Sequence, residues 1–126
     1  LHKTENSYES SSHQFKDALK GNGKVLLVED YYPNIIVTGT FLEQFGYDYD
    51  VAENGHVALQ KFMENSYTTI LMDVQMPGMD GYQVTQAIRK YEIKNNQLPA
   101  YIIGVTAHAT SQDREKCLEA GMDDYM

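Results

Sequence analysis

The chain has little cysteine and no long apolar run. Its single cysteine, Cys117, cannot form a disulfide within the chain, which favours a reducing compartment, and we expect a cytoplasmic location. No apolar run approaches the roughly 18 residues of a membrane span, and the N-terminus lacks the apolar core of a signal peptide. The sequence therefore predicts no contact with a membrane.

Basic residues are also scarce. The 126 residues include 10 Lys and Arg against 18 Asp and Glu, which gives a net charge of −8. Direct binding of nucleic acid needs a basic surface that meets the phosphates, so we expect no nucleic-acid partner. With 42% hydrophobic residues, the chain is long enough for one domain with its own core.

The first part of the chain differs in composition from the rest. Residues 1–23 contain no Val or Ile and four Ser, a composition that buries little surface and predicts a polar, Ser-rich linker. Gly21 and Gly23 precede the first apolar run, so they do not form a phosphate-binding loop after a strand. The folded domain is predicted at residues 24–126.

Within this domain, β-type and helical patterns alternate. Strands are predicted at residues 24–28, 47–52, 69–72 and 101–105, and a helical pattern follows each of them. Such alternation indicates an α/β fold with a parallel sheet and right-handed crossovers. The length and pattern favour a flavodoxin-like, doubly wound sheet with strand order 2-1-3-4-5.

Several local features of the helices can be predicted as well. Asn54 and Ser111 are expected to cap the second and fourth helices, and Gly39 is expected to have a close packing neighbour. In the fourth helix, Leu118 should face the core beside Cys117. Three basic residues should lie favourably near the C-terminal end of the third helix: Arg89, Lys90 and Lys94.

Three carboxylates follow two of the buried strands. Glu29 and Asp30 end the first strand, and Asp73 ends the third. In the order 2-1-3-4-5 these strands are neighbours, and ligands bind in the crevice at their carboxyl ends. Clustered carboxylates repel one another, and Mg²⁺ is the cation that such oxygen ligands accept. A simpler role for Asp73, which is to cap the turn that follows, remains open on this stretch alone.

Five segments resemble one known family. They occur in the family's order and spacing, and together the resemblance covers residues 24–126. On these segments the chain is similar to the receiver domains of two-component signalling, whose fold is the CheY-like form of the flavodoxin-like sheet. The segments are residues 25–30 (VLLVED), 52–55 (AENG), 70–82 (ILMDVQMPGMDGY), 105–108 (VTAH) and 120–125 (AGMDDY).

The resemblance implies a role for each residue of the site. Asp73 would be the phosphoacceptor, and it would hold Mg²⁺ together with Glu29, Asp30 and the backbone carbonyl of Gln75. A carboxylate can attack phosphorus to give an acyl phosphate. The phosphoryl donor would be a histidine kinase or a histidine-phosphotransfer domain.

Two further residues match the family's switch. Thr106 would hydrogen-bond the attached phosphoryl group, and Tyr125 matches an aromatic residue that turns inward in response. The Ser-rich lead-in and the motif details are most similar to receivers at the C-terminal end of hybrid histidine kinases. A receiver that controls a DNA-binding output domain is the alternative.

Readings from other classes also remain. An Asp-nucleophile phosphohydrolase that needs a metal generally has a second Asp two residues after the nucleophile, where this chain has Gln75. A binding module that works without phosphate is disfavoured by the intact Glu29, Asp30, Asp73 and Thr106.

The sequence departs from the family at its end. The family has a Lys-Pro pair beginning three residues beyond the position of Tyr125, whereas the residues given end at Met126. The Lys, most of the fifth strand and the fifth helix are therefore expected to be missing. An open edge at the fourth strand would favour a homodimer or a swapped contact with another chain.

Overall fold

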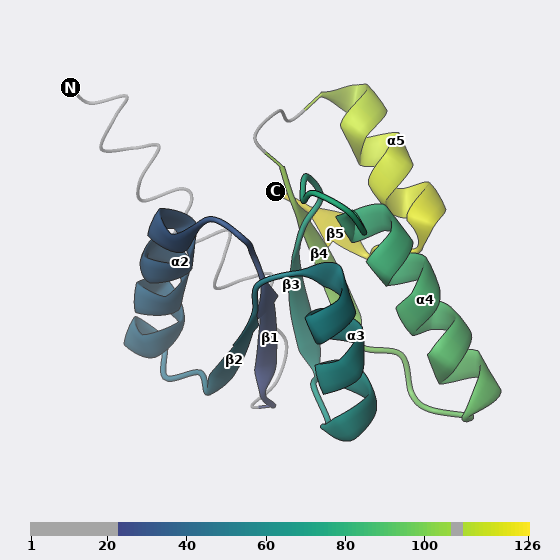
Figure 1. Ribbon diagram of the computed structural model, residues 1–126, viewed down its shortest axis with the longest axis horizontal. Coiled ribbons are helices and arrows are strands. Elements are labelled where there is room, and N and C mark those ends of the chain that lie inside the picture. Colours follow the sequence, from purple (N-terminus) through teal and green to yellow (C-terminus); the bar gives the residue numbers. More distant parts are fainter. Residues whose placement is uncertain (1–22, 107–109) are drawn as a thin grey trace.

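The computed structural model describes residues 23–106 and 110–126, which form one sheet with helices on both faces (Figure 1). The predicted linker lies outside the described residues apart from Gly23. The sheet has five parallel strands in the order β2-β1-β3-β4-β5, which confirms the predicted topology. The strands are β1 (Val25–Val28), β2 (Tyr49–Ala52), β3 (Thr69–Asp73), β4 (Tyr101–Val105) and β5 (Asp124–Tyr125).

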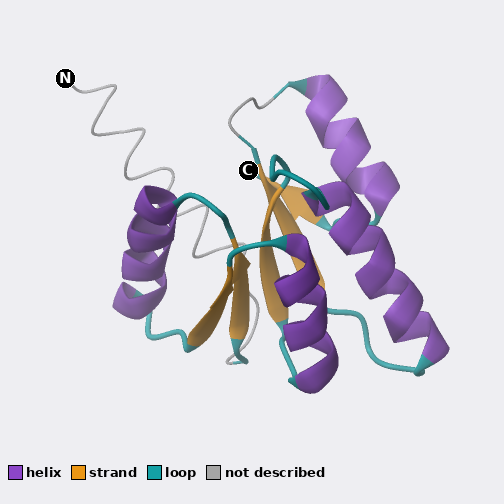
Figure 2. Cartoon of the chain, viewed as in Figure 1, coloured by secondary structure: helices purple, strands orange, loops and turns teal. Residues whose placement is uncertain are grey.

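The four described helices are divided unequally between the two faces. The helix that follows β1 lies on one side, and the other three lie on the opposite side (Figures 1 and 2). Each helix follows a strand, as right-handed crossovers between parallel strands require. The helices are α2 (Tyr32–Gln44), α3 (Gly55–Glu64), α4 (Gly81–Lys94) and α5 (Ser111–Ala120).

The central strands are buried on both faces. In β1, Val25 and Leu27 pack with Leu42 of α2, whereas Leu26 and Val28 pack on the other side with residues of α3 and α4. All four side chains are at most 3% exposed. This two-sided burial explains why the strand is a continuous apolar run rather than an alternating one.

The short strand β5 lies against the end of β4. Its two residues pair with Ile103 and Gly104, and the next N–H, that of Met126, donates to the Gly104 carbonyl at 2.8 Å. The open edge expected along β4 is therefore occupied by β5 over these residues. Within the given sequence, β5 has two residues.

Two predicted helix caps have different outcomes. The Asn54 side chain accepts from the Val57 N–H at 2.9 Å, which confirms it as the cap of α3. In α5 the cap is Thr110, whose hydroxyl accepts from the Asp113 N–H at 3.1 Å. The prediction of Ser111 was wrong by one residue, because Thr110 is the residue with an extended backbone three positions before a helical N–H.

The buried stripe of α5 is narrower than expected. Cys117 is fully buried, as predicted, and Ala120 is 7% exposed, but Leu118 is 48% exposed. One residue along a helix turns the side chain by about 100°, so Leu118 points away from the stripe that contacts the sheet. The prediction for Leu118 was therefore wrong.

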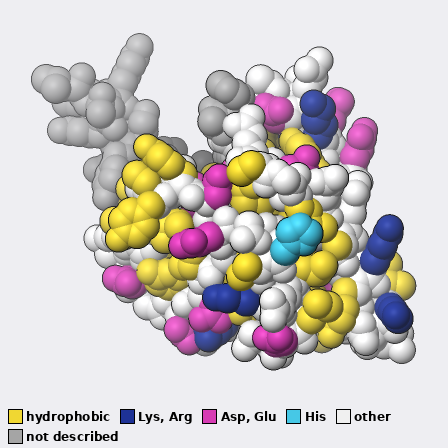
Figure 3. All heavy atoms as spheres, viewed as in Figure 1, with side chains coloured by type: hydrophobic (Ala, Val, Ile, Leu, Met, Phe, Trp, Pro, Cys, Tyr) yellow, Lys and Arg dark blue, Asp and Glu magenta, His cyan; other side chains and the backbone are white. Residues whose placement is uncertain are grey.

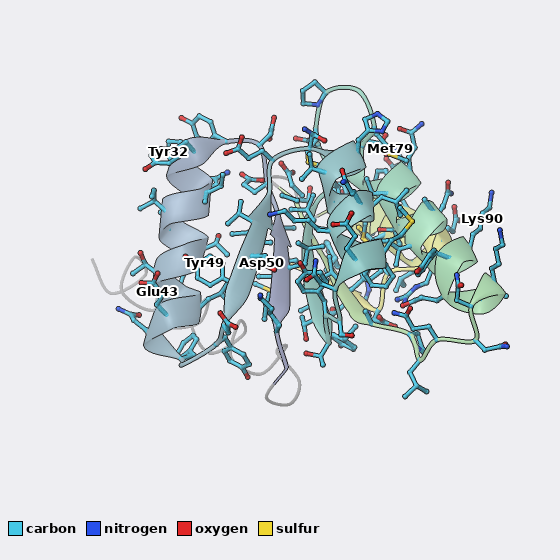
Figure 4. All side chains as sticks on the ribbon, turned by 60° about the horizontal axis from the view of Figure 1, so that its bottom comes forward. Tyr32, Glu43, Tyr49, Asp50, Met79 and Lys90 are labelled. Atoms are coloured by element: carbon cyan, nitrogen blue, oxygen red, sulfur yellow. The ribbon has the colours of Figure 1, made fainter. Side chains whose placement is uncertain are left out.

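Gly39 has the close neighbour that was predicted. A Cβ atom at this position would collide with the hydroxyl of Tyr49 on β2. The Tyr49 hydroxyl donates to Glu43 of α2 at 3.2 Å, so the ring lies along the helix (Figure 4). The glycine thus allows α2 to pack closely against the edge strand.

A second glycine positions the end of β3. A Cβ atom on Gly81, the first residue of α4, would collide with the carbonyl oxygen of Asp73 and lie 2.8 Å from the Cα atom of Val74. Both neighbours are backbone atoms, which cannot move aside as a side chain can. The start of α4 therefore rests directly on the backbone that carries Asp73.

We predict that Gly81→Ala lowers the free energy of unfolding by about 1–3 kcal/mol, because the added methyl group overpacks against backbone. Urea unfolding measures the effect. Gln86→Ala, at an exposed position of the same helix, is the matched control and should change stability by less than about 0.5 kcal/mol. Equal stability of the two variants would show that Gly81 has room for a side chain.

Candidate functional site

Three carboxylates meet at the carboxyl edge of the sheet. Glu29 and Asp30 follow β1 directly, and Asp73 is the last residue of β3. The two strands pair in parallel from Val25 with Thr69 to Val28 with Met72, so they end at the same level. One oxygen atom from each carboxylate lies within 4.8 Å of the other two. The strand order thus brings the residues together as expected.

Glu29 is the most buried of the three. Glu29 is 6% exposed, and its Oε1 atom has no hydrogen-bond partner among the described residues. Burial, followed by the hydrogen bond and charge of Asp73, raises the pKa of Glu29 to about 8, while the Asn34 side chain acts in the opposite direction. One oxygen of an ionised Glu29 would therefore lack a hydrogen-bond partner among the described residues.

Asp73 is half-buried, and the backbone holds one of its oxygen atoms. The Gln75 N–H donates to Asp73 Oδ1 at 3.0 Å. Burial raises the pKa of Asp73 and nearby Asp30 adds to the rise, whereas hydrogen bonds from Glu29 and Gln75 oppose it. The structure thus shows the N–H of Gln75 in contact with the site, and a ligand role for its carbonyl stays a prediction.

The carboxylates open into a cleft of about 510 Å³ between α2 and the ends of the strands. Thr106, after β4, lines the cleft, as does Gln75. No Lys or Arg is among the described residues that line it. The cleft is therefore acidic at the strand ends and is bounded elsewhere by neutral side chains.

Two cleft residues on the side of α2 were missed by the sequence analysis. Tyr31 and Asn34 line the cleft, and Asn34 lies close enough to Glu29 to affect its pKa. The positions of Tyr31 and Asn34 in the sequence could have indicated that they lie near the cleft. A helix that starts directly after Asp30 must place its first turn over the strand ends, so the polar residue one turn in lies near the carboxylates.

Tyr125 lies beside the cleft and does not line it. Its ring is partly buried against the core on the α3–α5 face, and its hydroxyl is 3.5 Å from the Thr110 carbonyl at the start of α5. Residues 107–109, between Thr106 and Thr110, lie outside the described residues. Thr106 and Tyr125 are linked through the backbone, because the Thr106 N–H donates to the carbonyl of Met126 at 3.1 Å.

The donor set fits a hard divalent cation. All three side chains offer carboxylate oxygens, and the buried Glu29 oxygen, which has no partner in the described part of the chain, is the kind of atom that a cation compensates. Mg²⁺ prefers such oxygen ligands and keeps water in its remaining positions, which the open cleft can hold. The residues present are therefore consistent with the expected Mg²⁺ site.

Comparison with known proteins identifies the family. Residues 25–126 match the response regulator receiver domain, and the chain therefore belongs to the receiver domain family of two-component signalling. Its relatives include the sensor protein GacS of Pseudomonas syringae pv. syringae, which is 41% identical over 82% of this chain. Hybrid signal transduction histidine kinase L of Dictyostelium discoideum is 39% identical over 93% of this chain. The matches span only 11% and 7% of those proteins.

Solved structures agree with this assignment. The receiver domain of sensor histidine kinase PA1611 from Pseudomonas aeruginosa PAO1, solved with magnesium in its active-site cleft, has a TM-score of 0.73 and 38% identity, covering 84% of each chain. The receiver domain of Saccharomyces cerevisiae Ssk1, solved with the histidine phosphotransfer protein Ypd1, has a TM-score of 0.80 and 31% identity, covering 86% of this chain and 79% of that one. Among the described helices of the present chain, none is long and apolar enough to cross a membrane.

We predict that Asp30→Asn weakens Mg²⁺ binding without lowering stability in metal-free buffer. The substitution removes one ligand, but it also removes the Asp30 charge, which disfavours ionisation of Glu29 and Asp73. Melting curves with and without Mg²⁺ measure both effects. The wild type should gain stability with Mg²⁺, and the variant should gain much less from an equal or higher starting Tm.

The control is Asp48→Asn, an exposed carboxylate that precedes β2 at the opposite end of the sheet. It should keep the full response to Mg²⁺. If Asp30→Asn unfolds earlier than the wild type without metal, the three carboxylates are not a repulsive cluster.

We also predict that stability without metal falls as the pH rises from about 4.5 to about 8. The folded pKa of Glu29, about 8, exceeds the usual value of 4.5, so the folded state binds this proton more tightly than the unfolded chain. Its contribution is therefore complete at low pH and is lost as the pH rises. In urea unfolding at pH 5 and pH 8, Glu29→Gln should reduce the fall. An equal fall in both proteins would mean that Glu29 does not hold a proton in this range.

Proposed function

We propose that this chain is a phosphoacceptor domain that takes a phosphoryl group from a phosphohistidine onto Asp73, with Mg²⁺, as a relay or switch within a hybrid sensor histidine kinase. The observation that carries the proposal is the convergence of three carboxylates at the ends of β1 and β3, with a buried Glu29 oxygen that has no partner among the residues that the structure describes. The similarity to receivers of hybrid histidine kinases supports the wider role.

Asp73 is the nucleophile best supported by the geometry. The Gln75 N–H fixes one carboxylate oxygen, which orients the other, and the side chain lies in the cleft rather than beneath it. As an oxygen of Asp73 bonds to phosphorus, the bond from phosphorus to the imidazole nitrogen breaks, and its electron pair stays on that nitrogen. Glu29 is too buried for this role.

Glu29, Asp30 and Asp73 would hold the Mg²⁺ ion, with the Gln75 carbonyl as the further ligand inferred from the family. When bound, the cation supplies positive charge that offsets the carboxylates and the incoming phosphoryl group. The similarity to a receiver solved with magnesium in its cleft supports this assignment.

Thr106 would hydrogen-bond the phosphoryl group from the β4 side of the cleft, and the Tyr125 ring would turn inward in response. A backbone hydrogen bond between Thr106 and the residue after Tyr125 supports this coupling. The Thr106 N–H binds the carbonyl of Met126, and Met126 follows Tyr125 directly. A shift of Thr106 toward the phosphoryl group would therefore pull on β5, which is how an attached phosphate can bias one of two local arrangements.

The donor would be a protein that docks over the cleft beside α2. Tyr31, Tyr32, Ile36 and Val37 are 50–68% exposed on the outer and N-terminal surface of this helix. Figure 3 shows hydrophobic side chains gathered there with acidic ones beside them, and Figure 4 shows Tyr32 at the outer end of the helix. Exposed apolar patches mark protein contacts. The Ypd1 complex of a similar receiver supports a histidine-phosphotransfer domain or kinase as the partner.

Three further expectations remain predictions: a cytoplasmic location, the absence of a nucleic-acid partner, and a homodimer or swapped contact.

We predict that Asp73→Asn abolishes phosphorylation, because the amide keeps the shape but is not a nucleophile. Intact mass after incubation with acetyl phosphate and Mg²⁺ measures uptake. The wild type should gain one phosphoryl group and the variant none. Asp80→Asn, in the same loop but serving as the cap of α4, is the control and should still be phosphorylated. Equal uptake by Asp73→Asn would overturn the assignment.

We predict that Ile36→Asp slows phosphotransfer from a phosphorylated histidine-phosphotransfer protein by about tenfold, because it places a charge in the docking surface. The rate with acetyl phosphate, which needs no docking, should be unchanged. Met63→Asp, at an exposed apolar position on α3, is the control for an added charge. If both variants slow the protein donor equally, the donor does not dock on α2.

A further inference from the structure

Arg89, on α4, makes four hydrogen bonds at the edge of the sheet opposite the cleft. Its Nε atom donates to the Gly121 carbonyl at 2.9 Å, and its Nη1 atom donates to Glu92 at 2.8 Å and to the Ala100 carbonyl at 2.9 Å. Its Nη2 atom donates to Asp123 at 2.8 Å. Arg89 therefore binds the turn between α5 and β5 rather than the end of its own helix, where the sequence placed it.

Both carboxylates of this network also accept backbone N–H groups at or just before the start of β4. Glu92, which is 3% exposed, accepts from the Ala100 N–H at 2.6 Å. Asp123 accepts from the Ile102 N–H at 2.8 Å through the same oxygen that binds Arg89. The guanidinium thus joins α4, the start of β4 and the residue just before β5.

Strand β5 is short, and both ladder bonds and apolar contacts hold it. It has two residues, and its flanking ladder bonds are those from Asp123 N–H to the Ile102 carbonyl and from Met126 N–H to the Gly104 carbonyl, both 2.8 Å. Met122, before the strand, is 4% exposed, and the side chains of Tyr125 and Met126 pack against the core. The anchor at Asp123 adds a charged contact that holds the residue just before β5 against β4 and α4.

The far end of β5 contacts the cleft. The Met126 carbonyl accepts the N–H of Thr106, and both residues line the cleft. A displacement of β5 would therefore release the backbone of Thr106. Only the two residues of β5, Asp124 and Tyr125, lie between Asp123 and Met126.

We propose that Arg89 is a positioning residue for the cleft: by holding Asp123 and the Gly121 carbonyl, it fixes β5 and thereby the Met126 carbonyl that holds Thr106. Arginine suits this role because its planar guanidinium offers five N–H donors in fixed directions, and lysine has no such fork. The carboxylates of the magnesium site come from β1 and β3, so this anchor acts on the Thr106 side of the cleft alone. The effect of Arg89 on phosphorylation rests on the proposed function, whereas its effect on the position of β5 does not.

The first test measures amide hydrogen exchange by NMR in Arg89→Lys and Asp123→Ala. The N–H groups of Thr106 and Met126 should exchange at least about tenfold faster, which corresponds to about 1.4 kcal/mol of local opening. The N–H groups of Leu26 and Leu27 in β1 should change only as far as global stability changes. Asp123→Asn, which keeps an oxygen at this position, should restore most of the protection lost in Asp123→Ala.

The control is Lys90→Gln, the next residue of α4, whose exposed side chain points away from the helix (Figure 4). It should leave all of these exchange rates unchanged. Because the Asp123 side chain is 39% exposed, the Asp123 variants decide the matter even if Arg89→Lys folds poorly. Equal acceleration of Thr106 and of the β1 amides would overturn the proposal.

The second test measures phosphorylation by acetyl phosphate over a range of Mg²⁺ concentrations. The rate constant at saturating Mg²⁺ should fall roughly three- to tenfold in Asp123→Ala, with the apparent Kd for Mg²⁺ unchanged. A parallel loss of Mg²⁺ affinity would mean general loosening and would contradict the proposal. If the wild type itself takes up no phosphate, the proposed function fails, and hydrogen exchange still decides the role of Arg89.

Discussion

The repulsion among three carboxylates is the constraint on which the rest of the site depends. Parallel pairing of β1 and β3 ends both strands at one level and brings Glu29, Asp30 and Asp73 together. Burial then raises the pKa of Glu29 and of Asp73, because an ionised group loses hydration there. Such a cluster lowers the stability of the folded state, and a bound cation would offset this cost by pairing with the carboxylates.

The surrounding backbone keeps this cluster in place. Gly81 lets the start of α4 rest on the carbonyl of Asp73, and Asp80 and Gln83 cap that helix reciprocally. The Val74 N–H donates to the Val105 carbonyl at 3.2 Å, which ties the loop after β3 to the end of β4. The backbone on both sides of the Asp73 carboxylate is therefore held by contacts with α4 and β4.

The strand order and the carboxylate cluster could be predicted from the sequence. The alternation of apolar strands and helices indicates one sheet topology, and that topology brings the strand ends together. A continuous apolar run such as residues 25–28 indicates a strand buried on both faces, and acidic residues at the ends of two neighbouring strands must meet. The roles of Asp73, Gln75 and Thr106 came from family resemblance, and the geometry places all three in the cleft without testing those roles.

Other features depend on contacts that sequence spacing does not reveal. Arg89 looked like a cation at a helix end, but its partners Gly121 and Asp123 lie more than thirty positions away in the chain. Thr110 and Ser111 are both good caps, and only the backbone conformation selects between them. Leu118 is apolar yet exposed, because α5 meets the sheet along a narrow stripe.

Anomalous diffraction from a crystal grown with Mn²⁺ would show directly whether the three carboxylates form one cation site. Manganese accepts the same oxygen ligands as magnesium and gives an anomalous signal that identifies its position. We expect a single strong peak with carboxylate oxygens of Glu29, Asp30 and Asp73 around it. Anomalous density elsewhere, or none at saturating Mn²⁺, would contradict it.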